Sequence, residues 1–182
     1  NFRVLERDGP LIVTRGEGIH VYDDSGNEYI EGLAGLWCTS LGFNEPRLIE
    51  AATKQMNALP YYHNFAGRAS DTIIELAAKL IELAPVPMSK VFFANSGSEA
   101  NDTVVKLVWY YNNALGRPEK KKIISRLKGY HGVTVAAGSL TALPYAQDGF
   151  DLPIDRILHT DTPCFYRNGE EGESEEALGS VC

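Results

Sequence analysis

The sequence predicts an α/β fold with a mostly parallel sheet, because short apolar runs alternate with helical segments from Lys90 onward. Residues 91–94 (VFFA) have the character of a buried strand, and the helix that follows them extends to about Leu115. Residues 123–127 and 156–159 are further strand candidates. This order of elements is typical of a sheet whose strands share one direction and are covered by helices.

The N-terminal part of the chain carries β-prone runs instead, at residues 11–15, 18–22 and 28–31. The turn-rich sequence DDSGN at 23–27 separates the last two runs and predicts a hairpin over 19–30. A glycine-punctuated apolar segment follows at 32–38. It has too little polar surface to lie in water, so we expect another part of the protein to cover it.

Two amphipathic helices are expected between this lobe and residue 90. Pro46 suits the first turn of a helix over 46–57, and Ser70 is the expected N-cap of a helix over 71–83. Their apolar residues recur at helical spacing and are expected to face inward. These residues are Leu48, Ile49, Ala52, Met56, Ile73, Leu76, Ala77 and Leu80.

The corner after residues 91–94 has the features of an anion site. Ser96 and Glu99 form an S-x-x-E capping box, which makes Ser96 the expected N-cap of the next helix. Free N–H groups and the positive end of the helix dipole then suit a phosphate, Gly97 permits close approach, and the Ser98 hydroxyl can donate. The alternative is that this corner only starts a helix; no Walker or G-x-G-x-x-G sequence accompanies it.

The helix after this corner is expected to stop at Gly116 and Pro118. Its predicted inward stripe is Val104, Leu107, Val108, Tyr111 and Leu115. The lysines at 120–122 are expected to be a solvated entry to the strand at 123–127. A second glycine-flanked corner, GYHG at 129–132, precedes a short helix within 133–141. The acidic stretch 167–182 is expected to be a solvated, loop-like segment.

Composition narrows the function classes. A net charge of −7 argues against nucleic acid or an anionic membrane surface as the main partner. No apolar run approaches the length of a membrane-spanning helix. The three cysteines are far apart and form no C-x-x-C pair, so we expect free thiols in a reducing, cytoplasmic setting and no metal site.

Three segments together resemble the class III aminotransferases: GLWC at 35–38, NSGSEANDT at 95–103 and GYHG at 129–132. Within that family they are most similar to the ω-aminotransferases that act on an amine or ω-amino acid and pyruvate. The resemblance runs in order and spacing from Pro10 to about Pro163. It implies a fold-type I enzyme that uses pyridoxal 5′-phosphate and works as a homodimer with active sites at the subunit interface.

The resemblance also assigns cofactor-binding roles. Ser96, Gly97 and Ser98 match the family's phosphate-binding turn, in agreement with the anion site described above. Tyr130 matches the aromatic residue that stacks on the pyridine ring, and His131 belongs to the same motif. The alternatives are a core aromatic at a strand end for Tyr130 and a satisfied structural histidine for His131.

Substrate-binding roles follow from the same comparison of motifs. Trp37 matches a residue that lines the substrate pocket. Phe65, with Tyr62 nearby, matches the aromatic loop that reaches the pocket from the partner subunit. The alternative for Tyr61, Tyr62 and Phe65 is ordinary packing at an interface.

In the family, a lysine holds the cofactor as a Schiff base and then acts as general base, while an aspartate pairs with the ring nitrogen. None of the eight lysines here lies in the context of that catalytic lysine, so no catalytic residue is assigned. We therefore interpret the chain as a fragment. Residues 1–45 are expected to be an N-terminal small-lobe segment with a β-hairpin, and residues 46–182 the first, incomplete part of the cofactor-binding large domain.

The reaction expected of the complete enzyme transfers an amino group from an amine or ω-amino acid to a keto acid such as pyruvate. Alternatives within the family are ornithine, γ-aminobutyrate or diamine transamination and the glutamate-1-semialdehyde aminomutase reaction. A non-catalytic binding or dimerisation module is an alternative of another class. A nucleotide-binding domain is disfavoured because no ribose-reading acidic motif accompanies the corner.

Overall fold

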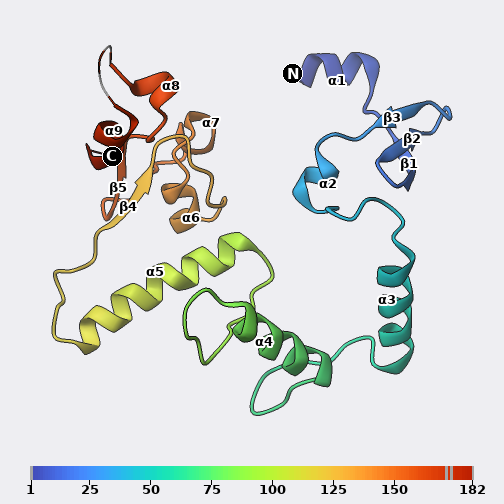
Figure 1. The fold of residues 1–182 in the computed structure, drawn as a ribbon, viewed down its shortest axis with the longest axis horizontal. Helices are drawn as coiled ribbons and strands as arrows, with labels where there is room; N and C mark the ends of the chain where they lie inside the picture. The colour runs from blue at the N-terminus through green and yellow to red at the C-terminus, as the bar shows by residue number, and fades with distance from the viewer. Residues whose placement is uncertain (1, 171, 173, 182) are drawn as a thin grey trace. The chain divides into compact units, whose positions relative to one another are not determined.

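The computed structural model describes residues 2–170, 172 and 174–181. It divides into two units, Asn1–Pro85 and Val86–Cys182, which can be followed by the residue-number colours of Figure 1. Within the described residues, no helix has the length and apolar character needed to cross a membrane. The expected division into residues 1–45 and 46–182 concerns lobes of a longer enzyme and stays a prediction.

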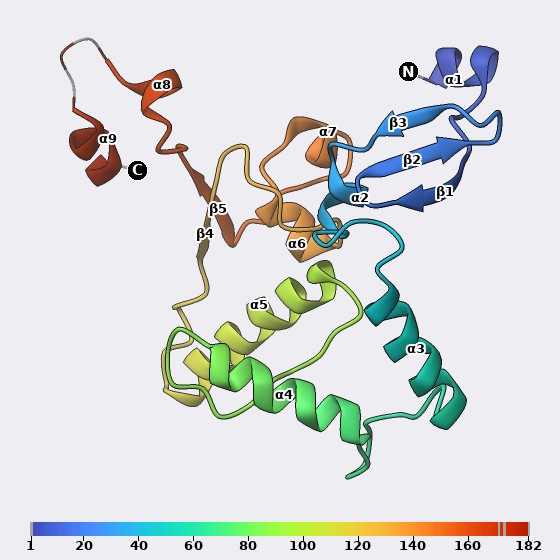
Figure 2. The same ribbon diagram turned by 45° about the vertical axis from the view of Figure 1, so that its right-hand side comes forward.

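The first unit contains a three-stranded antiparallel sheet preceded by helix α1 (Phe2–Asp8). Its strands are β1 (Val13–Glu17), β2 (His20–Asp23) and β3 (Glu28–Ile30), with β2 in the middle (Figure 2). His20 pairs with Ile30 across the turn, which confirms the predicted hairpin.

The turn of this hairpin is organised by the carboxylate of Asp23, which is buried. One oxygen accepts hydrogen bonds from the backbone N–H groups of Ser25 (3.0 Å) and Asn27 (2.8 Å). The other accepts from the Asn27 side-chain amide and the Tyr29 hydroxyl, both at 2.9 Å. These donors, the Asn27 amide first, lower the pKa of the Asp23 carboxyl against the opposing effect of burial.

We expect the hairpin to lose stability in acid through this one carboxylate. Because the folded pKa of Asp23 lies below the unfolded value of about 3.9, its contribution is present above that value and is lost as the pH falls through the folded pKa. Hydrogen exchange of the Ser25 and Asn27 amides between pH 6 and pH 2, corrected for intrinsic rates, measures it. Asp23→Ala should remove this pH dependence and Asp24→Ala should keep it; equal profiles for the two variants would contradict the assignment.

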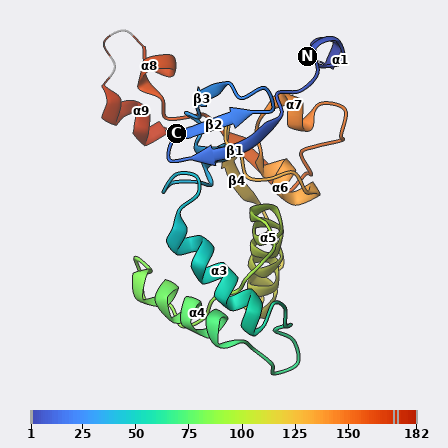
Figure 3. The ribbon, with the colours of Figure 1, turned by 90° about the vertical axis from the view of Figure 1, so that its right-hand side faces the viewer.

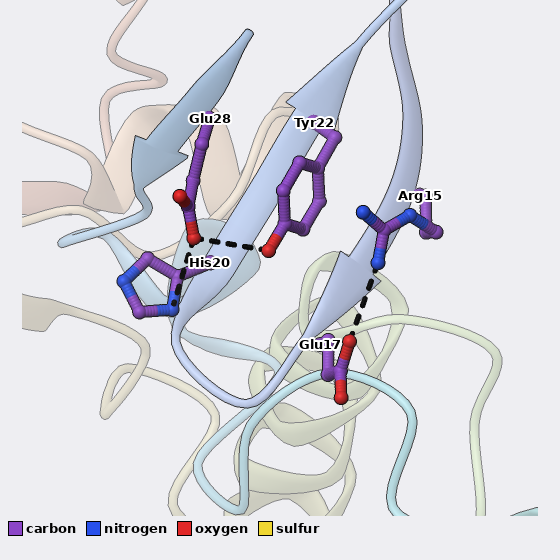
Figure 4. Close-up of polar contacts among 5 residues, drawn as sticks. All are labelled: Arg15, Glu17, His20, Tyr22 and Glu28. Atoms are coloured by element: carbon purple, nitrogen blue, oxygen red, sulfur yellow. Dashed lines mark hydrogen bonds and ion pairs between the residues drawn. The ribbon is translucent and has the colours of Figure 1, made fainter. Parts of the chain in front are cut away.

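Polar side chains occupy one face of the same sheet (Figure 4). The Tyr22 hydroxyl donates to Glu28 Oε1 at 2.9 Å, which raises the pKa of Tyr22, and His20 Nδ1 lies 3.8 Å from the same oxygen. The Arg15 guanidinium pairs with Glu17 at 3.2 Å and lies 3.6 Å from the centre of the Tyr22 ring. The contacts of Glu28 with Tyr22 and His20, and of Arg15 with Tyr22, join neighbouring strands and support their register, whereas the Arg15–Glu17 pair lies within β1. Each of these exposed contacts contributes little stability.

Helices α3 (Pro46–Ala58) and α4 (Asp71–Leu83) confirm the two predicted amphipathic helices, with Pro46 in the first turn. Ser70 occupies the N-cap position of α4, but its hydroxyl makes no capping hydrogen bond. The prediction that their apolar stripes are buried is wrong for this structure, because neither helix has a buried residue. Leu48, Met56 and Leu76, for example, are 59%, 68% and 49% exposed.

The accessible surface explains these open faces. It amounts to 14615 Å², whereas a compact protein of this mass exposes about 8,700 Å² and two separate compact units of half the mass about 10,500 Å². The excess therefore does not depend on how the two units are placed. Apolar helix faces stay uncovered because the chain supplies too few elements to pack on them.

The second unit begins with helix α5 (Gly97–Ala114) and strand β4 (Ile123–Arg126). Helices α6 (Val135–Leu140) and α7 (Pro144–Gln147), strand β5 (Ile157–Thr160), and helices α8 (Phe165–Asn168) and α9 (Glu175–Val181) follow. Strands β4 and β5 pair in parallel, with Ile123 opposite Ile157, which confirms a parallel sheet and both predicted strands. The prediction that 167–182 is loop-like is wrong for its described part, since α9 lies there.

Residues 91–94 do not form the predicted strand, although their apolar character suggested one. A strand exists only where a neighbour completes its hydrogen-bond ladder, and no described segment pairs with these residues. Phe92 is accordingly 71% exposed. The residue types at 91–94 favour a strand, but none of the described strands pairs with this segment.

Helix α5 ends where expected, in a glycine-terminated Schellman turn. Gly116 has φ +67°, its N–H donates to Asn113 O, and the Arg117 N–H donates to Asn112 O. The predicted inward face is wrong, because the buried residues are Val105 and Asn112, while Leu107 is exposed and Val108 only half-buried.

The lysine run after α5 is only partly solvated, in contrast to the expectation. Lys121 Nζ donates to the backbone oxygen of Trp109 at 2.8 Å, and Trp109 Nε1 donates to the backbone oxygen of Lys121 at 3.0 Å. This reciprocal pair attaches the segment before β4 to α5.

The core of the second unit lies around α6, which Figures 2 and 3 show beside the N-terminal end of α5. Ala137 and Ser139 of α6 are fully buried, as is Thr141 directly after it. Ser125 of β4 donates to Leu140 O at 2.6 Å and so joins the sheet to this helix. The two candidate cofactor segments both lie against this core.

Candidate cofactor and substrate site

The serine-rich corner starts helix α5 as the sequence predicts. Ser96 is the N-cap, with its hydroxyl oxygen accepting a hydrogen bond from the Glu99 N–H at 3.2 Å. The reciprocal half of the capping box differs from the expectation. The Glu99 carboxylate accepts from the backbone N–H and side-chain amide of Asn95, at 2.9 and 3.1 Å, rather than from the Ser96 N–H.

The first turn of α5 leaves donors free at the position expected for a phosphate. Within the described residues, the N–H groups of Gly97 and Ser98 donate to no protein acceptor. The Ser98 oxygen accepts from the Val133 N–H at 3.1 Å, so its own hydrogen stays available for donation. Two backbone donors and one hydroxyl donor at a helix N-terminus fit a phosphate group.

The aromatic corner 129–132 is bound to the same helix turn. The Asn101 side-chain amide donates to His131 O at 2.6 Å. Asp102 Oδ1 accepts from the Thr134 hydroxyl at 2.7 Å and from the Ala137 N–H at 2.9 Å, which caps α6 from a neighbouring element. Helix α5 therefore holds both the corner and the helix that follows it.

Gly132 is the point of closest approach between the two segments. Its φ is +133°, and a Cβ built there would lie 2.5 Å from Ser98 Oγ and 2.9 Å from Ser98 Cα. Only glycine fits this contact without movement of the backbone. The structure thus brings the predicted phosphate turn and the corner that carries Tyr130 and His131 into direct contact. The side chains of Tyr130 and His131 are both exposed.

Trp37 belongs to the first unit, in the short element α2 (Ala34–Trp37). Residues 34–37 all have positive φ, between +50° and +65°, so this is a left-handed turn, which is strained for residues other than glycine. The Glu31 carboxylate holds it by accepting from the N–H groups of Leu33, at 3.0 Å, and Gly35. Trp37 is 74% exposed, and no described residue of the first unit covers it, so the cover expected for residues 32–38 stays a prediction.

Tyr62 and Phe65 lie in the loop between α3 and α4, also in the first unit. Tyr62 stacks on His63, with ring centres 4.8 Å apart, and Phe65 is 79% exposed. The cofactor segments belong to the second unit, so the substrate-binding roles of Trp37, Tyr62 and Phe65 stay predictions.

Sequence reasoning missed the residues that support the site. Asn101 and Asp102 lie inside a motif it singled out, three and four residues after Ser98, where side chains share a helix face. That spacing was a usable signal. The sequence gives no such signal for Glu31 and Thr141, because their hydrogen-bond partners are backbone groups of irregular segments.

The family model described as "Aminotransferase class-III" matches residues 4–181. The chain belongs to the class III aminotransferases. This family membership confirms the resemblance drawn from the three motifs, two of which meet where Ser98 contacts Gly132 and Val133.

Curated relatives of this class III aminotransferase include gamma aminobutyrate transaminase 1, mitochondrial, of Solanum lycopersicum, 58% identical over 172 residues. The probable gamma-aminobutyrate transaminase 2, mitochondrial, of Oryza sativa subsp. indica is 56% identical. Each match covers 94% of this chain, but only 33% and 35% of the relative. The chain therefore spans about a third of the length of these relatives.

Solved structures give the same result. The omega transaminase from Pseudomonas jessenii in complex with PMP matches with a TM-score of 0.95 and 62% identity. A PMP-bound aminotransferase from Vibrio fluvialis matches with a TM-score of 0.94 and 42% identity. Each match covers 99% of this chain and 40% of the other. They confirm the fold-type I α/β assignment, and with the family they point to pyridoxal phosphate as the cofactor.

Proposed function

We propose that the whole protein to which this chain belongs is a pyridoxal-phosphate-dependent transaminase that moves an amino group from an amine or ω-amino acid to a keto acid such as pyruvate. The observation that supports this most directly is the contact of Ser98 with Gly132 and Val133. It places the free donors of Gly97 and Ser98 next to the corner that bears Tyr130.

The residues of this chain fit the phosphate end of that cofactor. The N–H groups of Gly97 and Ser98 and the Ser98 hydroxyl would hold the phosphate, and Tyr130 would lie against the ring. When bound, the cofactor supplies an electron-withdrawing ring that stabilises the negative charge left when a proton leaves the carbon bearing the amino group. The chain's contribution is to orient that ring and to hold its charged end. The residue that moves the proton is expected outside these 182 residues.

Substrate choice is proposed to depend on Trp37 and Phe65, with Tyr62 beside them. A variant of a related transaminase, engineered for asymmetric synthesis of enantiopure bulky amines, replaces a tryptophan and a phenylalanine. These two residues are separated by the same number of positions as Trp37 and Phe65 here. Large side chains at both positions would restrict the pocket to small substituents on the donor.

The names of the curated relatives favour γ-aminobutyrate as one donor, and this compound is itself an ω-amino acid. A homodimer is proposed because Tyr62 and Phe65 match an aromatic loop that, in the family the chain resembles, reaches into the substrate pocket of the other subunit. A cytoplasmic location is proposed from the cysteines alone, of which Cys38 and Cys164 are free thiols.

The proposal predicts that the whole protein, loaded with pyridoxal phosphate, forms alanine from pyruvate with a primary arylalkyl amine or γ-aminobutyrate as donor. Chromatographic measurement of alanine, with ornithine and a diamine as parallel donors, tests this. Trp37→Gly should raise kcat/KM for a bulky amine relative to a small one, while Tyr166→Ala, which changes a side chain 95% exposed, should not. Cofactor binding without alanine formation from any of these donors would refute the proposed reaction.

A further inference from the structure

Thr141 is a fully buried polar residue whose hydroxyl, within the described part of the chain, forms hydrogen bonds with the backbone of His131 and Gly132 only. Its oxygen accepts hydrogen bonds from the N–H groups of His131, at 2.8 Å, and Gly132, at 3.1 Å. Its hydrogen is donated to Gly132 O at 2.9 Å. One donor and two acceptor positions are all that a threonine hydroxyl has, so its bonding capacity is used completely on the aromatic corner.

The residue next to Thr141 holds the other side of the corner. The Lys128 N–H donates to Ala142 O, and the Ala142 N–H donates to Gly129 O, both at 3.0 Å. Tyr130 therefore lies between two anchored stretches of backbone. Its own hydroxyl makes no hydrogen bond within the described residues, and its side chain is 59% exposed. The direction of the Tyr130 ring thus depends on the backbone around it rather than on contacts of its own.

Thr141 is itself rigidly placed. Its N–H donates to Ala137 O at 3.0 Å at the end of α6, and Ser125 of β4 donates to the preceding Leu140 O. A hydroxyl at this buried position costs free energy unless it is fully bonded. Packing alone does not require it, since valine has nearly the same shape.

We propose that Thr141 is the positioning residue that fixes the Tyr130 ring against the cofactor, acting through the backbone of His131 and Gly132. This inference rests on the proposed function, because it takes Tyr130 to lie on the cofactor ring. It adds a role for a residue that contacts neither substrate nor cofactor.

The test compares Thr141→Val, which keeps the shape and loses the hydroxyl, with Thr141→Ser, which keeps the hydroxyl, in the whole cofactor-loaded protein. Thr141→Val is expected to lower the visible circular dichroism of the bound cofactor at least about twofold. It should also lower kcat on the order of tenfold, the effect of losing one or two hydrogen bonds. Thr141→Ser should restore most of both. Spectra recorded well below each variant's Tm separate this effect from a loss of stability.

A second readout does not depend on activity. Hydrogen exchange of the His131 and Gly132 amides should accelerate on the order of tenfold or more in Thr141→Val, but stay slow in Thr141→Ser. In a Tyr130→Ala background, Thr141→Val should have no further effect on the cofactor signal, because the two residues act in series. A full additional effect in that background would overturn the proposal.

The outcomes separate this inference from the proposed function. If the wild-type protein binds cofactor and Thr141→Val shows an unchanged spectrum and kcat, the positioning role is wrong while the function stands. If the wild-type protein binds no cofactor, both the proposed function and the positioning role of Thr141 are refuted. The hydrogen-exchange rates of the His131 and Gly132 amides then still show whether Thr141 holds this backbone.

Discussion

Replacement of Gly132 by alanine is expected to abolish tight cofactor binding and to destabilise the second unit by about 2–6 kcal/mol. The new Cβ would lie 2.5 Å from Ser98 Oγ, 2.8 Å from Ala137 Cβ and 2.9 Å from Ser98 Cα. Backbone cannot yield as a flexible side chain does, so the corner or the first turn of α5 must shift. Overpacking costs about 1–3 kcal/mol, and the φ of +133° adds a cost of similar size.

Gly116→Ala is the matched control for this experiment. Gly116 also has a positive φ, +67°, but a Cβ there meets nothing within 4 Å. It should therefore cost only about 1 kcal/mol and leave cofactor affinity unchanged. Thermal unfolding and titration of the cofactor absorbance measure both variants in the whole protein. If Gly132→Ala is no more harmful than Gly116→Ala, the close contact with Ser98 is not needed for the site.

Ser98→Ala is expected to weaken cofactor binding by about 1.5–3 kcal/mol, or on the order of tenfold to a hundredfold in Kd, because it removes a hydrogen bond to a charged phosphate. The same change leaves the Val133 N–H without its acceptor, so the aromatic corner loses a contact at the same time. Both consequences reduce retention of the cofactor.

Dialysis of the loaded whole protein, followed by absorbance of the remaining cofactor, gives the rate of loss for Ser98→Ala. Ser40→Ala is the control, since this exposed serine lies in the first unit and its hydroxyl makes no hydrogen bond in the described part of the chain. Equal loss rates for the two variants would count against a phosphate at this turn.

Features with local causes were predictable from the sequence. The hairpin follows from the turn residues at 23–27, and the start of α5 follows from Ser96 as N-cap. The end of the same helix follows from Gly116, whose missing side chain permits a left-handed φ. Each of these signals acts over a few residues, so no knowledge of distant partners is needed.

Features that depend on partners were predicted less well. Residues 91–94 look like a strand but find no ladder, and the apolar stripe of α5 lies beside the face that is buried. The Glu99 carboxylate accepts hydrogen bonds from Asn95 rather than from the Ser96 N–H, because Asn95 offers two donors, its backbone N–H and its side-chain amide. In each case the sequence shows which residues are apolar or can form a hydrogen bond. The neighbouring elements of the fold determine which partner each of them contacts.

The sequence by itself determined the family, the candidate cofactor residues and the local caps and turns, because these depend on residue types at fixed short spacings. Only the tertiary structure decided that Ser98 contacts Gly132 and Val133, which lie more than thirty positions away. It likewise decided that Thr141 holds the corner beside Tyr130. Hydrogen bonds and steric contacts act over a few ångströms of space, and the distance between two residues along the chain does not reveal when folding brings them that close.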